Sequence, residues 1–402
     1  MAADGEGNPQ DTLMDTMTVL LQQQCLPFGV VHTSKAFCEG IAASTGVRLD
    51  AACQSDVMAA LASTFVRRCI VKLHLSGHFP ASLQQAQPLG WSSITSLTLH
   101  KFKGGISSLP PNLEQLCLNR TVLDAEMMHV MTTTAPASLH TLKLLRCPIA
   151  CAVEELKLPT TLRTFACAQD TRGASELPCC TRAFRIRLPD GLQHLHLMLW
   201  GVLEGTPFPT SLESLHLQCC AIGNEQGNNH SQQQRDRHDG VRVPAGLRKL
   251  AVADCEFNSG FGDLPPSLIT FDASRDNGAN LANADHDECD EMCDGYLFNP
   301  YTWSLAPLPP GLVHLDLRDL DVYDAPLGPL PCTLQFLHMG WQFGKELGPL
   351  PPGLTHLQLG RSYNRALGPL PHTLQQLETA SDGVPVNTAS ETAPQNRDGV
   401  KV

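Results

Sequence analysis

Histidine is the residue type whose placement along this chain could carry chemistry. Seven of the sixteen histidines fall at alternating positions of short L-x-L segments, where a strand would turn them all to one side. Most of them form two groups. The first group is His194, His196 and His216, accompanied by Met198 and Gln218. The second group is His314, Asp316, Arg318, Phe336, His338, His356 and Gln358.

Three interpretations of these histidine groups stay open. Imidazoles on neighbouring strands lie within about 5–6 Å of one another, which is close enough to share a metal ion. Aromatic, arginine and amide side chains also suit the centre of a protein–protein interface. The repeat that builds the strands could equally favour histidine at half-exposed positions without any function. The functional hypothesis is a surface for a protein partner, and we expect no metal site there.

A separate cluster of possible metal ligands lies at residues 285–294, which read DHDECDEMCD. Carboxylates, two thiols and one imidazole could attract a divalent ion. The two cysteines are three residues apart, no second cysteine pair follows, and the calcium-loop pattern D-x-D-x-D-G is missing. We therefore expect a solvated acidic loop.

Sequence signatures of catalysis are missing from the chain. It contains no G-x-S-x-G, no phosphate-binding P-loop and no H-E-x-x-H. The adjacent cysteines at 179–180 and 219–220 could be reactive, but only Arg182 and Arg185 offer the first pair the positive charge that depresses a thiol pKa. We expect a protein that is not an enzyme and has no cofactor, with a metal- or thiol-dependent activity as an alternative.

The overall composition narrows the class of partner. The chain has 402 residues and a formal net charge of -12, and only 17% of its residues are charged. This acidic net charge argues against binding to nucleic acid or to an anionic membrane surface, because both require a basic face on the protein. No signal peptide and no apolar run of membrane-spanning length are visible. Sixteen cysteines without a secretory signal favour a reducing, cytoplasmic compartment.

The elements that would position the histidines come from an internal repeat, L-x-x-L-x-L, usually with a proline three residues before its first leucine. Most neighbouring copies lie about 19–26 residues apart, and three longer intervals contain insertions. The period is that of a leucine-rich repeat. Thirteen copies begin at Ile70, Ile94, Leu113, Leu139, Leu162, Leu192, Leu212, Leu247, Leu268, Leu312, Leu334, Leu354 and Leu374.

Counting the first apolar residue as position one, each copy predicts a short strand with leucines at positions four and six. Because these leucines face one side, stacked copies would form a curved parallel sheet with a continuous leucine core. Positions three, five and seven would then lie on the concave face of the sheet. Position nine holds cysteine in three copies, where we expect a small donor to bond the turning backbone: Cys147, Cys220 and Cys255.

The predicted fold is therefore an α/β, strand-rich leucine-rich-repeat solenoid. It covers residues 69–380, with insertions near 168–188, 221–243 and 274–306. Residues 11–68 predict a small helical cap with helices near 12–26, 32–43 and 55–67. We expect disorder at residues 1–10 and 381–402.

The C-terminal copies resemble FNIP repeats, a variant of the leucine-rich repeat. The similarity is best from Leu308 to Leu377 and rests on an aromatic residue followed by Asn after the strand, then a Gly/Pro lead-in to the next Leu-Pro. Tyr363-Asn364 and Phe257-Asn258 match this step, and Phe343-Gly344 and Tyr323-Asp324 match it in part. The L-P-x-x-L-x-x-L rhythm is also similar to secreted bacterial leucine-rich-repeat effectors.

Proteins with FNIP repeats often begin with an F-box, which docks on the adaptor of a cullin ubiquitin ligase. Leu13 to Ile41 loosely resembles an F-box but lacks the usual Leu-Pro before its first helix. The alternative is a helical cap that only covers the first strand. We expect a protein–protein interaction scaffold, with a substrate receptor of a cullin-type ligase as the alternative that the resemblance implies.

Overall fold

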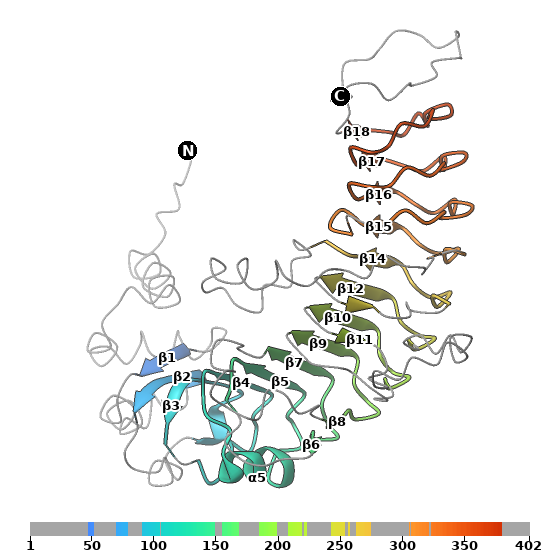
Figure 1. The fold of residues 1–402 in the computed structure, drawn as a ribbon. Coiled ribbons are helices and arrows are strands. Elements are labelled where there is room, and N and C mark those ends of the chain that lie inside the picture. Colours follow the sequence, from blue (N-terminus) through green and yellow to red (C-terminus); the bar gives the residue numbers. More distant parts are fainter. Residues whose placement is uncertain are drawn as a thin grey trace, which may run out of the picture. The chain divides into compact units, whose positions relative to one another are not determined.

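The computed structural model describes most of the repeat region. The described residues are 47–51, 70–78, 91–104, 106–148, 155–168, 185–198, 208–218, 221–222, 243–253, 256–257, 263–274, 305, 307–320 and 323–379. The chain divides into two compact units, Met1–Ala152 and Val153–Val402. Each unit is a stack of parallel strands joined by turns (Figure 1).

In the first unit, neighbouring strands in the sheet are also consecutive in the chain. Helix α5 (Ala125–Thr133) follows the fourth strand of this unit in the chain and precedes the fifth. A 3-10 turn, Trp91–Ser93, precedes the third strand. The strands are β1 (Val47–Ala51), β2 (Ile70–His78), β3 (Ser96–Lys103), β4 (Gln115–Asn119) and β5 (Thr141–Leu145).

The second unit repeats this arrangement with shorter strands. Its main strands are β7 (Thr164–Ala168), β9 (His194–Met198), β10 (Ser214–Gln218), β12 (Lys249–Ala253), β14 (Thr270–Asp272), β15 (His314–Asp316), β16 (Phe336–His338), β17 (His356–Leu359) and β18 (Gln376–Thr379). Two further parallel pairs lie beside the main sheet: β6 (Glu155–Lys157) with β8 (Arg185–Arg187), and β11 (Ala221–Ile222) with β13 (Glu256–Phe257).

Every predicted copy forms a strand, and the register is the predicted one. Position four pairs with position four of the next copy, as in Leu315↔Leu337 and Leu337↔Leu357. The leucines at these positions are buried, whereas positions three and five are mostly half-exposed or exposed. The prediction of a strand-rich, parallel-sheet solenoid of leucine-rich-repeat type is confirmed.

The proline before each copy opens a β-turn. From Leu113 to Leu374, the amide N–H of the first leucine donates to the carbonyl of the residue three positions earlier, which is proline in every case, at 3.0–3.3 Å. Four of these turns have a second proline at their next position, where a fixed φ near -65° suits the turn: Pro111, Pro266, Pro310 and Pro352. The proline lead-in therefore sets the entry of each strand.

The residue just before the first leucine alternates between a hydroxyl and glycine in the second unit. The hydroxyl of Thr373 donates to the carbonyls of Pro352 and Leu354, at 2.7 and 2.8 Å, and Thr333 and Ser267 bond the preceding copy in the same way. Successive copies from the start of this unit read Thr161, Gly191, Ser211, Gly246, Ser267, Gly311, Thr333, Gly353 and Thr373.

Position nine holds a small donor, as predicted, in the copies that begin at Leu113 and Leu139. Cys147 Sγ lies 3.3 Å from the carbonyl of Leu118 and 3.4 Å from that of Leu145. Thr121, one copy earlier, bonds the carbonyls of Leu99 and Asn119. Burial raises the pKa of the Cys147 thiol to about 12, so this cysteine is structural. Cys220 and Cys255 lie outside the described residues.

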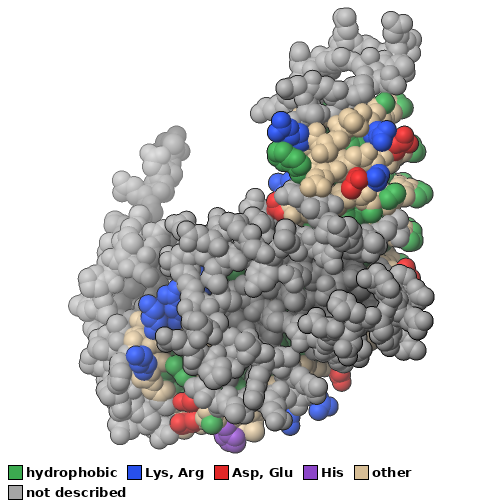
Figure 2. Space-filling model, in the orientation of Figure 1, with side chains coloured by type: hydrophobic (Ala, Val, Ile, Leu, Met, Phe, Trp, Pro, Cys, Tyr) green, Lys and Arg blue, Asp and Glu red, His purple; other side chains and the backbone are tan. Residues whose placement is uncertain are grey.

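The aromatic step that resembles the FNIP repeat builds a second buried column. Tyr323, Phe343 and Tyr363 stack with ring centroids 6.4 and 6.2 Å apart. The residue after the aromatic ties neighbouring copies together, because Asp324 Oδ1 accepts from the amide of Gly344 at 2.8 Å. Lys345 forms an ion pair with the same carboxylate, and charged side chains of both signs lie close together on this part of the second unit (Figure 2).

The sequence analysis did not predict the two short strand pairs, the 3-10 turn, helix α5 or strand β1. Helix α5 lies between the copies that begin at Leu113 and Leu139. Asp124 caps it by accepting from the amide of Met127, and its buried face is Met127, Met128, Val130 and Met131. Strand β1 lies within the range assigned to the helical cap and pairs in parallel with β2. The three expected helices, the insertions at 168–188, 221–243 and 274–306, and both expected disordered ends lie mostly or wholly outside the described residues.

Candidate partner-binding face

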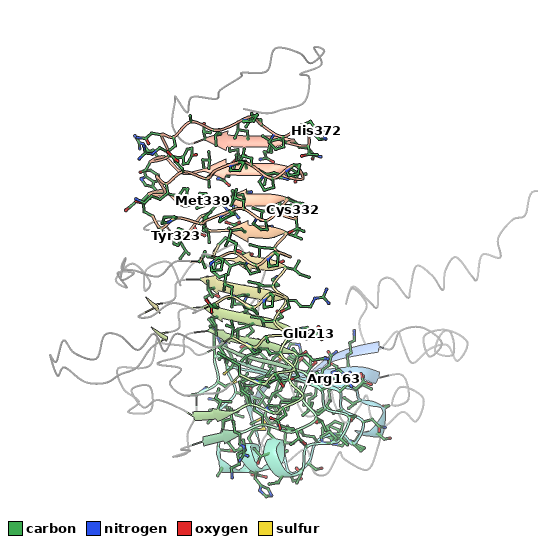
Figure 3. The ribbon with its side chains drawn as sticks, turned by 90° about the vertical axis from the view of Figure 1, so that its right-hand side faces the viewer. Arg163, Glu213, Tyr323, Cys332, Met339 and His372 are labelled. Atoms are coloured by element: carbon green, nitrogen blue, oxygen red, sulfur yellow. The ribbon has the colours of Figure 1, made fainter. Side chains whose placement is uncertain are left out.

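The side chains at positions three, five and seven form one face of the sheet in the second unit, here called the open face. Figure 3 shows the two edges of the sheet. Glu213, Cys332 and His372 lie at the edge where the turns enter the strands, and Tyr323 and Met339 lie at the edge where the strands end. Because leucines alternate with the open-face positions, the period of two fixes which side chains reach this surface. All ten predicted site residues belong to it.

The first histidine group forms a stacked pair on β9 and β10. His196 and His216 are register partners, and their rings lie 3.9 Å apart at an interplanar angle of 13°. His194 is exposed at the start of β9. His216 is buried, and its partner on the next strand is the small residue Ala251. The pair is therefore packed into the sheet surface.

Burial decides the charge of His216. Desolvation, with smaller contributions from the nearby His196 and Lys249, lowers its pKa to about 3. The imidazole is therefore neutral at physiological pH, and its buried Nε2 has no hydrogen-bond partner in the described structure. Within the described ranges, no three His, Cys, Asp or Glu side chains are grouped so that they could hold a metal ion. The cluster at 285–294 lies outside those ranges.

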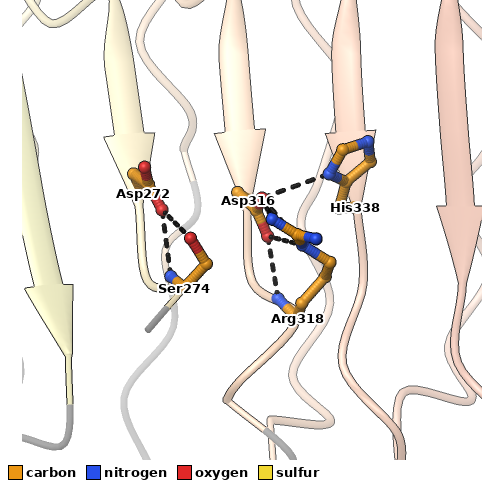
Figure 4. Close-up of polar contacts among 5 residues, drawn as sticks. All are labelled: Asp272, Ser274, Asp316, Arg318 and His338. Atoms are coloured by element: carbon orange, nitrogen blue, oxygen red, sulfur yellow. Dashed lines mark hydrogen bonds and ion pairs between the residues drawn. The ribbon is translucent and has the colours of Figure 1, made fainter. Parts of the chain in front are cut away.

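The second group is centred on the carboxylate of Asp316 in β15, which is only 2% exposed. Arg318 donates to it from Nε at 3.0 Å to each oxygen and from Nη2 at 2.8 Å to Oδ2. The Arg318 amide adds a bond to Oδ1, and His338 Nδ1 approaches Oδ2 at 3.1 Å (Figure 4). One buried anion thus holds two open-face side chains in place.

The electrostatics of this network keep Asp316 ionised. Burial alone would raise its pKa, but the hydrogen bonds from His338 and Arg318 outweigh that effect and lower the pKa to about 2. An ionised carboxylate only accepts hydrogen bonds, so His338 carries a proton on Nδ1. The pKa of His314 is also lowered, mainly by burial and against the opposing effect of Asp272 and Asp316.

Asp272, one strand before Asp316, repeats part of this pattern. Its Oδ1 accepts from the amide of Ser274 at 2.9 Å and from the Ser274 hydroxyl at 2.7 Å (Figure 4). Asp272 and Asp316 are register partners at position five. In both copies the carboxylate folds back on the residue two positions later, which anchors the end of the strand.

Position three of the same strands carries a row of rings. His314 and Phe336 lie 5.4 Å apart, and Phe336 stacks on His356 at 4.5 Å and 17°. Thr355 fixes the last ring through a 2.9 Å hydrogen bond to His356 Nδ1. Gln358 continues the neighbouring row as the register partner of His338. The structure therefore brings all seven residues of the second group together on β15 to β17 and the turn after β15.

Two residues beside this group were missed in the sequence analysis. Trp341 is 52% exposed, and the Arg361 guanidinium lies 5.5 Å from the centre of its ring. They occupy position eight of neighbouring copies, one residue after Gly340 and Gly360. The available signal was an isolated tryptophan in a chain with only four, placed in a turn rather than at a leucine position.

The two histidine groups are distinct sites. The first lies on β9 and β10 and the second on β15 to β17, and strands β12 and β14 separate them in the sheet. Position five of those separating strands carries Ala251 and Asp272, not histidine. Only the second group combines aromatic, arginine and exposed tryptophan side chains.

Comparison with known proteins gives similarity at the level of fold only. No family model matches, and no curated protein matches. The solved structure described as CroV588, a novel circular LRR protein, has a TM-score of 0.43 and 19% identity. It covers 76% of this chain, which in turn spans 46% of CroV588.

YopM from Yersinia enterocolitica WA-314 has a TM-score of 0.41 and 19% identity, over 83% of this chain and 67% of YopM. Similarity this low says nothing about function, so the classification rests on the chain's own strand register and leucine core. The protein is a parallel-sheet solenoid of leucine-rich-repeat type.

Proposed function

We propose that the protein is a non-catalytic interaction scaffold that binds a protein partner through the open face at β15 to β17. The observation that carries the proposal is the pre-arranged surface around Asp316. Arg318 and His338 are held by hydrogen bonds, and Phe336 is held between His314 and His356. Because these side chains are already ordered, binding a partner costs little further conformational entropy.

The composition of this surface also supports a protein partner. Tryptophan and arginine are enriched among the residues that dominate binding energy at interfaces, and Trp341 and Arg361 adjoin the group. The first histidine group exposes fewer side chains to a partner, because His196 and His216 stack on each other and His216 is buried. We therefore assign the partner to the second group and leave His194, His196 and His216 as a secondary contact.

The test uses the full chain and two matched triple variants in affinity purification with mass spectrometry. The first variant carries Phe336→Ala, Trp341→Ala and His356→Ala on the open face. The second carries Cys332→Ala, Gln335→Ala and His372→Ala, which are exposed on the turn margin of the same copies. We expect a partner that the wild type and the margin variant retain and the open-face variant loses. Equal recovery by both variants would refute this binding face.

A second proposal is that the protein is a substrate receptor of a cullin-type ubiquitin ligase. It is supported by the resemblance of Leu13 to Ile41 to an F-box and by the stacked aromatic step at Tyr323, Phe343 and Tyr363. The decisive deletion must spare β1, because Val47–Ala51 pairs with β2. A chain lacking residues 1–43 should lose the ligase adaptor and keep the open-face partner; no adaptor with the full chain would refute this role.

A further inference from the structure

Three consecutive copies of the first compact unit place a basic residue at position eight, within the end of β3 or directly after β4 and β5. These residues are Lys101, Arg120 and Arg146. All three have a left-handed backbone, with φ of 48°, 50° and 52°. They are the only non-glycine residues with positive φ in the described structure. The three copies therefore repeat the same unusual turn with the same kind of side chain.

The local backbone does not explain the choice of a basic side chain. The left-handed region costs an ordinary residue about 1 kcal/mol, and glycine or asparagine occupies it more easily. Backbone positions that retain such strain are enriched at functional sites. Lysine and arginine thus occupy a position where a purely structural turn would favour other residues.

Among the residues that the structure describes, no acidic side chain pairs with these three cations. Adjacent strands lie about 4.8 Å apart, well within the screening distance of about 8 Å at physiological salt, so neighbouring cations repel each other. None of the three forms an ion pair with a described side chain. Lys101 and Arg120 contribute to lowering the pKa of His100 at the end of β3, after the larger effect of burial. In Figure 2, Lys and Arg side chains gather over β2 and β3.

Two acidic side chains in the described part of this unit are engaged elsewhere. Glu114 pairs with His140 near the entering turns, and Asp124 caps α5. The sheet face beside the cations carries one more cation, Lys143, and several neutral hydrogen-bonding groups: Ser96, Thr98, Gln115, Asn119 and Thr141. At the open-face positions of β3 to β5 no Phe, Tyr or Trp is available for stacking a base, as single-stranded nucleic acid requires, and the ring of His100 packs edge-on against His74. Hydroxyl and amide groups beside unpaired cations instead suit carboxylates and peptide groups.

We propose that this surface, Lys101, Arg120 and Arg146 together with the polar face of β3 to β5, docks an acidic segment of a protein partner. Each cation pairs with a carboxylate of that segment, which removes the mutual repulsion of the column. The surface belongs to the first compact unit and is independent of the face over β15 to β17. Although the chain as a whole is acidic, this surface attracts anions.

The test measures fluorescence anisotropy of a labelled glutamate-rich peptide against the full-length protein. The key variant is Lys101→Asn/Arg120→Asn/Arg146→Asn, because asparagine tolerates the left-handed turn and the fold is kept. The matched control is Arg163→Asn/Arg187→Asn/Arg248→Asn, which removes the same total charge from exposed positions of the other unit. Both variants are checked for thermal stability.

We expect wild type and control to bind the glutamate peptide alike, and the key variant to bind at least about tenfold more weakly. A glutamine version of the peptide should not bind, and added salt should weaken the interaction. Unchanged binding by the key variant would overturn the proposal. Tighter binding of oligothymidylate at the same three residues would also overturn it and assign the surface to nucleic acid.

Discussion

His338 Nδ1 lies 3.1 Å from Oδ2 of Asp316, a residue 22 positions earlier in the chain and one strand away in the sheet. This contact joins a half-exposed imidazole to a carboxylate that is almost fully buried. The buried carboxylate therefore fixes the position of the open-face side chains that a partner would contact.

Replacing Asp316 with Asn should remove stability in a defined pH range. The folded pKa of about 2 is below the ordinary 3.8, so the carboxylate stabilises the fold at pH 7 by about 2 kcal/mol. This contribution is fully present above about pH 4 and is lost as the pH falls toward 2. Urea unfolding at pH 7 and pH 3 should show a larger difference between wild type and Asp316→Asn at pH 7. An equal difference at both pH values would contradict the assignment.

His216 should make the fold sensitive to mild acid at a higher pH than Asp316 does. Its folded pKa of about 3 lies below the usual 6.5, so below pH 6.5 the unfolded chain takes up the proton first. Stability should fall by about 2 kcal/mol between pH 7.5 and pH 5 because of this residue. Over the same pH range, the free energy of unfolding of His216→Gln should fall by about 2 kcal/mol less than that of the wild type. His194→Gln, on an exposed imidazole of the neighbouring strand, is the control and should behave like wild type.

Gly340→Ala should be strongly destabilising because of a close approach between copies. A Cβ at this position would lie 2.6 Å from the carbonyl oxygen of Leu320 and 2.9 Å from that of Leu317, so the backbone must move. We expect a loss of about 2 kcal/mol or more in the free energy of unfolding. Gly368→Ala is the matched control, because no atom lies within 4 Å of its added Cβ. Comparable effects of the two substitutions would disprove the close approach.

The hydroxyl of Thr373 should contribute measurably to the contact between the last two copies. Thr373→Val keeps the side-chain shape but removes the donor to the carbonyls of Pro352 and Leu354. We expect a loss of about 1–2 kcal/mol and faster hydrogen exchange in β18. Thr373→Ser should restore both quantities. If the valine variant exchanges like wild type, the bond is energetically neutral.

The strands and their register could be predicted because one residue type marks them. Apolar residues, mostly leucine, at positions four and six recur even across the long insertions, and a proline precedes every copy from Leu113 on. Strand β1 was missed because its sequence, VRLDA, has only one leucine and no proline lead-in. Helix α5 was missed although Asp124 and the apolar residues that follow it carry the usual start signal, because its interval has the ordinary spacing of the repeat and only a strand was expected from each copy.

The open face could be predicted in outline but not in its contacts. The period of two places Asp316, Phe336 and His338 on one side, yet nothing in the sequence says that Asp316 is the buried centre of the network. That outcome depends on side-chain packing across neighbouring strands. Trp341 and Arg361 lie beyond the regular strand, where the period no longer decides the direction of a side chain.

Alternation of hydroxyl and glycine at the entering turns implies that the elementary module is a pair of copies. Leu334, Leu354 and Leu374 are evenly spaced by twenty residues, and Thr333 and Thr373 make equivalent bonds while Gly353 lies between them. Excising residues 334–373 would join Thr333 to Leu374 and leave the alternation intact, whereas excising one copy would break it. Adding or removing a pair of copies therefore keeps the turn pattern, so we expect arrays changed by forty residues at this point to fold, whereas a change of twenty residues places two like turns side by side.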